Sequence, residues 1–89
     1  MKRYFKHRAE SDLGRGMAYM EFDDERVSRQ VEIYGDRWFC STVAYHPEIG
    51  PRLMDQPLSI LELTSADEIT QNEFESIWQE ALKHTLENG

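Results

Sequence analysis

The residues of this sequence with the most distinctive chemistry are a run of acids followed by two arginines. Asp23, Asp24 and Glu25 are consecutive, Arg26 follows directly, and Arg29 lies three residues further on. Ca²⁺ and Mg²⁺ prefer carboxylate oxygens, but a calcium loop places more ligands at alternating positions. Three consecutive acids are more typical of a solvated turn, so we predict no metal site and no cofactor.

The two arginines lie on a segment whose apolar residues alternate, which is typical of a strand. If Val27 and the apolar residues that alternate with it face the core, Arg29 faces it as well. A buried arginine must pair with an acid, and we favour a structural salt bridge to a carboxylate at a helix end or in a linker. The alternative is a fork that Arg26 and Arg29 present to an anionic ligand or to a partner's carboxylate.

Nucleophilic chemistry depends on one cysteine. Cys40 and His46 form a nucleophile and a base only if the fold brings them together. Nothing nearby in the sequence indicates an oxyanion hole or an activated thiol, and no cysteine or histidine pair has zinc-ligand spacing. A cysteine on a strand is more often a small buried apolar residue, so a Cys/His enzyme is an alternative that we disfavour.

The first eight residues interleave basic side chains with aromatic ones. Such a segment can contact phosphates and stack bases, so a small nucleic-acid or nucleotide binder is another alternative. The chain has a net charge of −7, and because these eight residues carry four basic groups and no acid, the remainder is still more acidic. Acidity repels phosphate, so we favour an edge strand whose charges block unwanted pairing.

Two aromatic residues, Tyr19 and Trp38, are candidate contacts for a partner. Both are expected on the sheet face that a single helix leaves open, as is Phe39. Together with Arg26 and Arg29, Tyr19 and Trp38 are the residues that we assign to ligand or partner binding. Exposed aromatics also favour self-association, so we expect a monomer or a weak homodimer.

An antiparallel sheet in the first half of the chain must position these side chains. Gly35-Asp36 is a two-residue hairpin signal, and a loop with two glycines spans residues 11–16. The segments that flank these turns are extended or alternate apolar with polar residues, and we predict that they form four strands: Lys2 to Ala9, Met17 to Phe22, Val27 to Tyr34 and Arg37 to Tyr45.

The C-terminus predicts one amphipathic helix over about residues 71–86. Thr70 and Glu73 fit a capping box, and Ile69 and Phe74 occupy the two positions of a hydrophobic staple. Apolar residues then recur on a single helical stripe, which needs a sheet face to cover it: Phe74, Ile77, Trp78, Ala81, Leu82 and Leu86.

The fold class is therefore α+β, with residues 1–89 as a single domain. It is an antiparallel β-meander of four to five strands with the C-terminal amphipathic helix packed on one face. Residues 46–69 contain three prolines. Within them, Leu58 to Thr64 is either a short strand or a loop packed under the helix.

The run from Glu21 to Asp36 resembles the signature of a family of small bacterial domains of unknown function. That signature is an acidic turn, an Arg-x-x-Arg-x-Val-Glu-Ile-aromatic strand and an Asp-Gly turn, where this chain has Gly35-Asp36. Ile69 to Trp78 is similar to the family's closing Ile-Ser-x-x-Glu-Phe-x-x-x-Trp helix. The resemblance supports the α+β fold and implies no activity.

Composition indicates a small cytoplasmic protein without a membrane segment. No apolar run approaches the roughly 18 residues of a membrane span, no export signal is recognisable, and a single cysteine excludes an internal disulfide. The acidic charge favours a basic protein partner, so the leading hypothesis is a protein-interaction module, for example an immunity-like inhibitor of a cationic toxin. Nucleic acid is the disfavoured partner.

Overall fold

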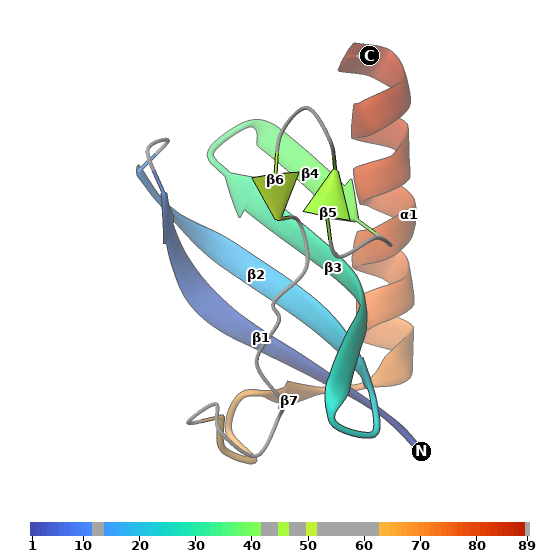
Figure 1. Ribbon diagram of the computed structural model, residues 1–89. Helices are drawn as coiled ribbons and strands as arrows, with labels where there is room; N and C mark the ends of the chain where they lie inside the picture. Colours follow the sequence, from blue (N-terminus) through green and yellow to red (C-terminus); the bar gives the residue numbers. More distant parts are fainter. Residues whose placement is uncertain (12–13, 42–44, 47–49, 52–62, 89) are drawn as a thin grey trace.

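The main element of the computed structural model is a five-stranded antiparallel sheet, and the structure describes residues 1–11, 14–41, 45–46, 50–51 and 63–88 (Figure 1). The strands lie in the order β4-β3-β2-β1-β7, so the first four form a meander. A separate two-stranded ladder joins β5 to β6. The bounds are β1 (Lys2–Ser11), β2 (Gly14–Asp23), β3 (Arg26–Tyr34), β4 (Arg37–Ser41), β5 (Tyr45–His46), β6 (Gly50–Pro51) and β7 (Glu68–Ile69).

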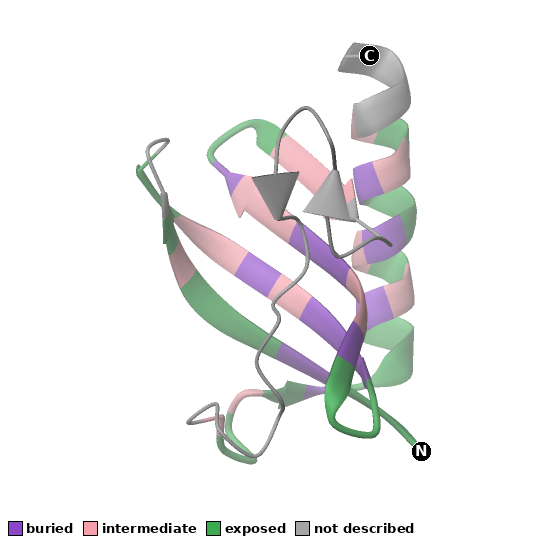
Figure 2. Cartoon of the chain, in the orientation of Figure 1, coloured by how far each residue is buried: buried purple, intermediate pink, exposed green. Residues whose placement is uncertain are grey.

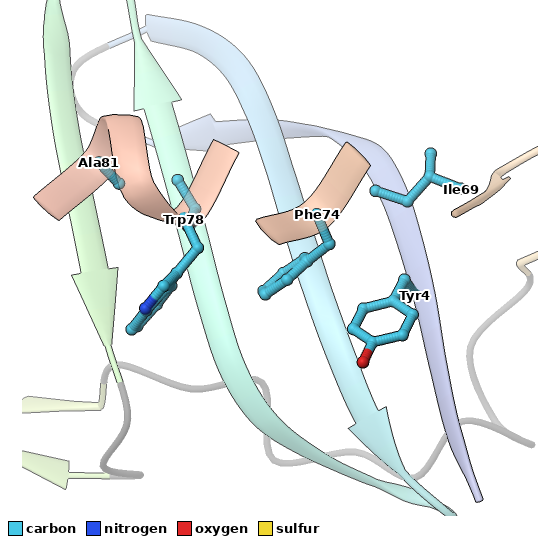
Figure 3. Packing of buried hydrophobic residues seen from close by; sticks show 6 residues of the cluster. Tyr4, Ile69, Phe74, Trp78 and Ala81 are labelled. Atoms are coloured by element: carbon cyan, nitrogen blue, oxygen red, sulfur yellow. The ribbon is translucent and has the colours of Figure 1, made fainter. Parts of the chain in front are cut away.

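A single helix, α1 (Gln71–Asn88), packs across one face of this sheet and confirms the α+β class. The Glu73 backbone N–H donates to the Thr70 hydroxyl at 3.1 Å, which is the predicted N-cap. Ile69 and Phe74 are buried in one cluster, as the predicted staple requires. Figure 3 shows the Phe74 and Trp78 side chains projecting from the helix toward the strands, with the Tyr4 ring beside Phe74.

Apolar side chains form one cluster on each face of the sheet. Buried positions lie in the middle of the strands and on the sheet side of the helix (Figure 2). The cluster under the helix consists of Tyr4, Val31, Ile69, Phe74, Trp78 and Ala81. The cluster on the opposite face consists of Phe5, Met20, Phe22 and Val27, with Leu63 packed against it. Leu63 therefore does not lie under the helix, and residues 52–62 are outside the described part of the chain.

A β-bulge in β3 changes which residues face the helix. Glu21 pairs with Arg29, but the next residue, Phe22, pairs with Val27, so Ser28 is the extra residue of β3. The prediction that Val27 and Arg29 share a face is wrong for this reason. Arg29 faces the helix, whereas Val27 lies in the opposite cluster.

The strand ends at the first turn differ from the predicted ones. β1 and β2 continue to Ser11 and from Gly14, so most of the predicted loop at 11–16 is strand. A Cβ on Gly16 would lie 2.1 Å from the Ile33 carbonyl oxygen, so only glycine fits there. The described part of β4 ends at Ser41, and because residues 42–44 are outside the described part, the predicted continuation to Tyr45 stays a prediction. The hairpin at Gly35 is confirmed, with φ of 64° at that residue.

β1 is not an edge strand along its whole length, contrary to the prediction. The short strand β7 pairs with Tyr4 and Phe5. The Lys6 backbone N–H also donates to the Asp67 carbonyl, at 2.9 Å. The N-terminal half of β1 is therefore an inner strand, and only its later residues reach the edge of the sheet.

Replacing the N-cap residue tests how much the helix start contributes to stability. Thr70→Ala removes the acceptor of the Glu73 N–H, so we expect the free energy of unfolding to fall by about 1 kcal/mol. Chemical denaturation followed by circular dichroism measures this change. Ser76→Ala, at an exposed position inside the helix, is the control and should not destabilise the protein. An equal loss in both variants would contradict the capping role.

Candidate functional site

The strongest polar cluster lies between the sheet and the helix and is centred on Arg29. Its guanidinium donates two parallel hydrogen bonds to the Glu21 carboxylate, from Nε at 2.9 Å and from Nη2 at 2.6 Å. It also donates from Nη1 and Nη2 to Glu75 on the helix. The bulge residue Ser28 donates its hydroxyl to Glu21 at 2.7 Å. Arginine matches carboxylates well in this bidentate geometry.

The same guanidinium lies over two aromatic rings of the helix. Its Cζ atom is 5.0 Å from the Phe74 ring centroid and 5.1 Å from the Trp78 centroid. Rings at this distance attract a cation through their negative faces. Arg29, with a side chain only 21% exposed, therefore has acids on two elements and apolar rings beside it. The structure thus shows a salt-bridged arginine, and the ligand fork stays a hypothesis.

The electrostatics of the cluster stabilise its charged form. Hydrogen bonds from Arg29 lower the pKa of Glu21 to about 2, with Ser28 and Tyr4 adding to the effect and burial opposing it. Hydrogen bonds to Glu21 and then to Glu75 raise the pKa of Arg29. Burial, reinforced by Glu21, raises the pKa of the Tyr4 hydroxyl. Glu21 and Arg29 are thus both charged at neutral pH, and hydrogen bonds within the cluster satisfy both side chains.

Two of the other predicted site residues, Tyr19 and Trp38, lie on the same face of the sheet as Arg29. Arg26 is exposed at the start of β3, opposite Asp23. Tyr19 and Trp38 pack against the cluster under the helix, so the prediction that they lie on the open face is wrong. Trp38 also stacks on His84 of the helix, with ring centroids 4.4 Å apart. Which face the helix covers is decided by long-range packing, and the alternation within one strand does not encode it.

The basic N-terminal segment is partly neutralised by acids. The Arg3 guanidinium pairs with Glu68 at 3.2 Å, and the Lys2 ammonium lies 3.8 Å from Glu21. The amino terminus pairs with Asp24 at 2.9 Å. These contacts reduce the positive charge that the segment can offer to a phosphate backbone.

The residues proposed for nucleophilic or metal chemistry are only partly described. Cys40 is half-buried and packs against the cluster under the helix, while the His46 side chain lies outside the described residues. The Cys/His pair therefore stays an untested, disfavoured alternative. Within the described ranges, no three His, Cys, Asp or Glu side chains gather where they could hold a metal ion.

A hollow of about 410 Å³ lies on the sheet face opposite the helix. His7, Ala18 and Glu32 pair across β1, β2 and β3 and form a row through it. The small side chain of Ala18 leaves the hollow between its larger neighbours. Met20 and Leu63 also line it and supply apolar surface. This volume is within the range of roughly 300–1,000 Å³ that ligand sites have.

The Glu32 carboxylate is the polar centre of this hollow. Gln30 donates its amide N–H to one carboxylate oxygen at 2.6 Å, and the Tyr34 hydroxyl donates to the other at 3.1 Å. Both donors are buried, whereas Glu32 is only half-buried. A carboxylate accepts about four hydrogen bonds, so this one is oriented and retains capacity for a cationic donor.

Sequence reasoning missed this site because it concentrated on the arginines. One signal was available: Gln30, Glu32 and Tyr34 alternate with the core residues Val31 and Ile33, which places three polar groups together on the other face.

Comparisons with known proteins add no family. Neither a protein-family model nor a curated protein matches this sequence. The resemblance to small bacterial domains therefore stays a prediction. No helix in the described part of the chain is long and apolar enough to cross a membrane.

The low pKa of Glu21 predicts a specific acid sensitivity. Because the folded pKa is about 2 and the ordinary value is 4.5, the stabilisation is complete above pH 4.5 and is lost as the pH falls toward 2. A depression of this size corresponds to about 3 kcal/mol. We expect Glu21→Gln to lower the free energy of unfolding by a similar amount at pH 7. The variant should also lose less stability than the wild type between pH 4.5 and pH 2. Urea denaturation at a series of pH values measures both effects.

Glu68→Gln provides the matched control, because Glu68 also pairs with an arginine but is exposed. Its effect at pH 7 should be much smaller, since exposed ion pairs contribute little. Equal effects of the two substitutions would show that the Arg29 cluster has no special role.

Proposed function

We propose that this chain is a protein-interaction module that binds a basic partner, and that one lysine or arginine of the partner enters the hollow beside Glu32. The observation that carries the proposal is the Glu32 carboxylate, which Gln30 and Tyr34 orient in a hollow that Ala18, Met20 and Leu63 also line. Sites of this kind combine apolar walls with a few convergent polar groups. An inhibitor of a cationic toxin is one form that such a module takes.

The charge distribution supports a cationic partner. The net charge of −7 attracts basic proteins and accelerates their encounter. A lysine or arginine stem would lie along Ala18 and Met20, because long basic side chains cover apolar surface with their methylene groups. Its head group would then reach the carboxylate, where partial burial strengthens the attraction.

The same features disfavour a nucleic-acid partner. Lys2 and Arg3, two of the basic groups of β1, already lie near acids. A phosphate backbone would also meet the repulsion of the acidic remainder of the chain. Arg8 and Glu10, which also line the hollow, carry charges that offset each other, so the oriented Glu32 carboxylate leaves an excess of negative charge there.

A peptide titration tests the proposal. The probe is a hexa-arginine peptide, added to the ¹⁵N-labelled protein at about 50 mM salt, where such contacts are weakly screened. We expect amide shifts centred on Ala18, Gln30, Glu32 and Tyr34, and binding that weakens as salt increases. Glu32→Gln should weaken binding about tenfold, in line with the roughly 1.5–3 kcal/mol of a hydrogen bond to a charged group.

Asp36→Asn is the matched control, because it removes one negative charge at an exposed turn and leaves the hollow intact. Binding to this variant should change little. If both variants lose the same affinity, or if the shifts spread over the outer surface of the helix, the peptide responds to net charge and the hollow is not the site.

A further inference from the structure

Among the described residues, no strand pairs with the outer edge of β1 beyond β7. β7 pairs with Tyr4 and Phe5, and the Lys6 N–H reaches Asp67. Backbone groups alternate between the two sides of a strand. Arg8 and Glu10 therefore direct their N–H and C=O groups to the same outer edge as Lys6. Figure 1 shows β7 beside the start of β1 only.

The two side chains at this open edge carry opposite charges. Arg8 and Glu10 are both exposed, and Ala9 between them is half-buried. In the described part of the chain, neither side chain makes a hydrogen bond or an ion pair. The one polar contact is a hydrogen bond between the His7 ring Nδ1 and the Arg8 carbonyl oxygen, at 2.9 Å.

We propose that this edge pairs antiparallel with the same edge of a second copy of the chain, about a two-fold axis at Ala9. In that register Ala9 lies opposite Ala9 of the other copy, and Arg8 lies opposite Glu10. Arg8 and Glu10 then form a hydrogen-bonded backbone pair, because both direct their groups outward. The two-fold axis repeats this pair, so the edge is self-complementary.

The charges at this edge differ from those of an edge that is protected against pairing with a second copy. Natural edges commonly carry charges that repel a second copy, whereas here the antiparallel register brings opposite charges together. Opposite charges directly across two strands stabilise the pairing, and like charges destabilise it. The open segment is short, because Lys6 is already bonded to Asp67. The dimer is therefore weak, and it forms at concentrations on the order of 1 mM.

Charge exchange across the edge tests this register. Sedimentation equilibrium of the wild-type chain should show a monomer–dimer equilibrium. Arg8→Glu and Glu10→Arg should each weaken the dimer about tenfold, because each places like charges opposite one another twice. The double variant, with the wild-type net charge, should restore it, and a mixture of the two single variants should form a heterodimer.

The Glu10→Arg variant separates this register from an effect of overall charge. Its net charge is less negative, so general repulsion alone would strengthen association, whereas the proposed pairing is weakened. Glu10→Pro removes one outward N–H at a position where an edge strand tolerates proline, and it should give a monomer with an unchanged circular dichroism spectrum. A monomeric wild-type chain, single variants that associate as well as wild type, or a mixture that associates no better than either single variant would overturn the proposal.

Discussion

The salt-bridged guanidinium of Arg29 fixes how the helix lies on the sheet. It binds Glu21 of the neighbouring strand and Glu75 of the helix, and it lies over the Phe74 and Trp78 rings. A largely buried cation must keep its partners, because losing one leaves an uncompensated charge. A helix shifted by one turn would remove Glu75 from Arg29 and would leave only one of the two rings beside it. The cluster therefore selects one docking position, and this specificity matters more than any net gain in stability.

Because the Arg29 cluster holds the helix on one face of the sheet, the two faces differ in what their side chains contact. The helix side is occupied by the aromatic cluster and the ion pair, so residues such as Trp38 serve packing there. The bulge at Ser28 keeps Arg29 on that side while Val27 lies in the opposite cluster. The opposite face carries Gln30, Glu32 and Tyr34 of β3, with the Glu32 carboxylate in the hollow. The proposed binding site is thereby on the other side of the sheet from the helix and its ion pair.

The features that sequence predicted are those that depend on neighbouring residues. The helix start at Thr70 and the hairpin at Gly35 follow from local hydrogen bonding and backbone freedom, and both are present. The bulge was missed because no residue type marks it, and it made the facing of Val27 wrong. The prediction that Tyr19 lies on the open face was also wrong. The helix is distant from Tyr19 in sequence, and the face it covers depends on the packing of all the apolar residues of its stripe.

The candidate site was harder to predict than the fold for the same reason. Arg29 could be assigned a buried salt bridge from alternation, but Glu21 and Glu75 were not identifiable as its partners without the register and the helix position. Glu32 looks like any exposed strand residue in the sequence. It becomes distinctive only when Gln30 and Tyr34 are seen to hold its carboxylate.

Side-chain NMR of Arg29 tests the central claim most directly. If the guanidinium is clamped between the sheet and the helix, its Nε–H gives a resolved, slowly exchanging signal. That signal should show nuclear Overhauser contacts to the Phe74 and Trp78 ring protons, and the ring currents should move the Arg29 methylene signals upfield. Arg29 signals at the positions of an unfolded chain, with no contact to either ring, would contradict this account.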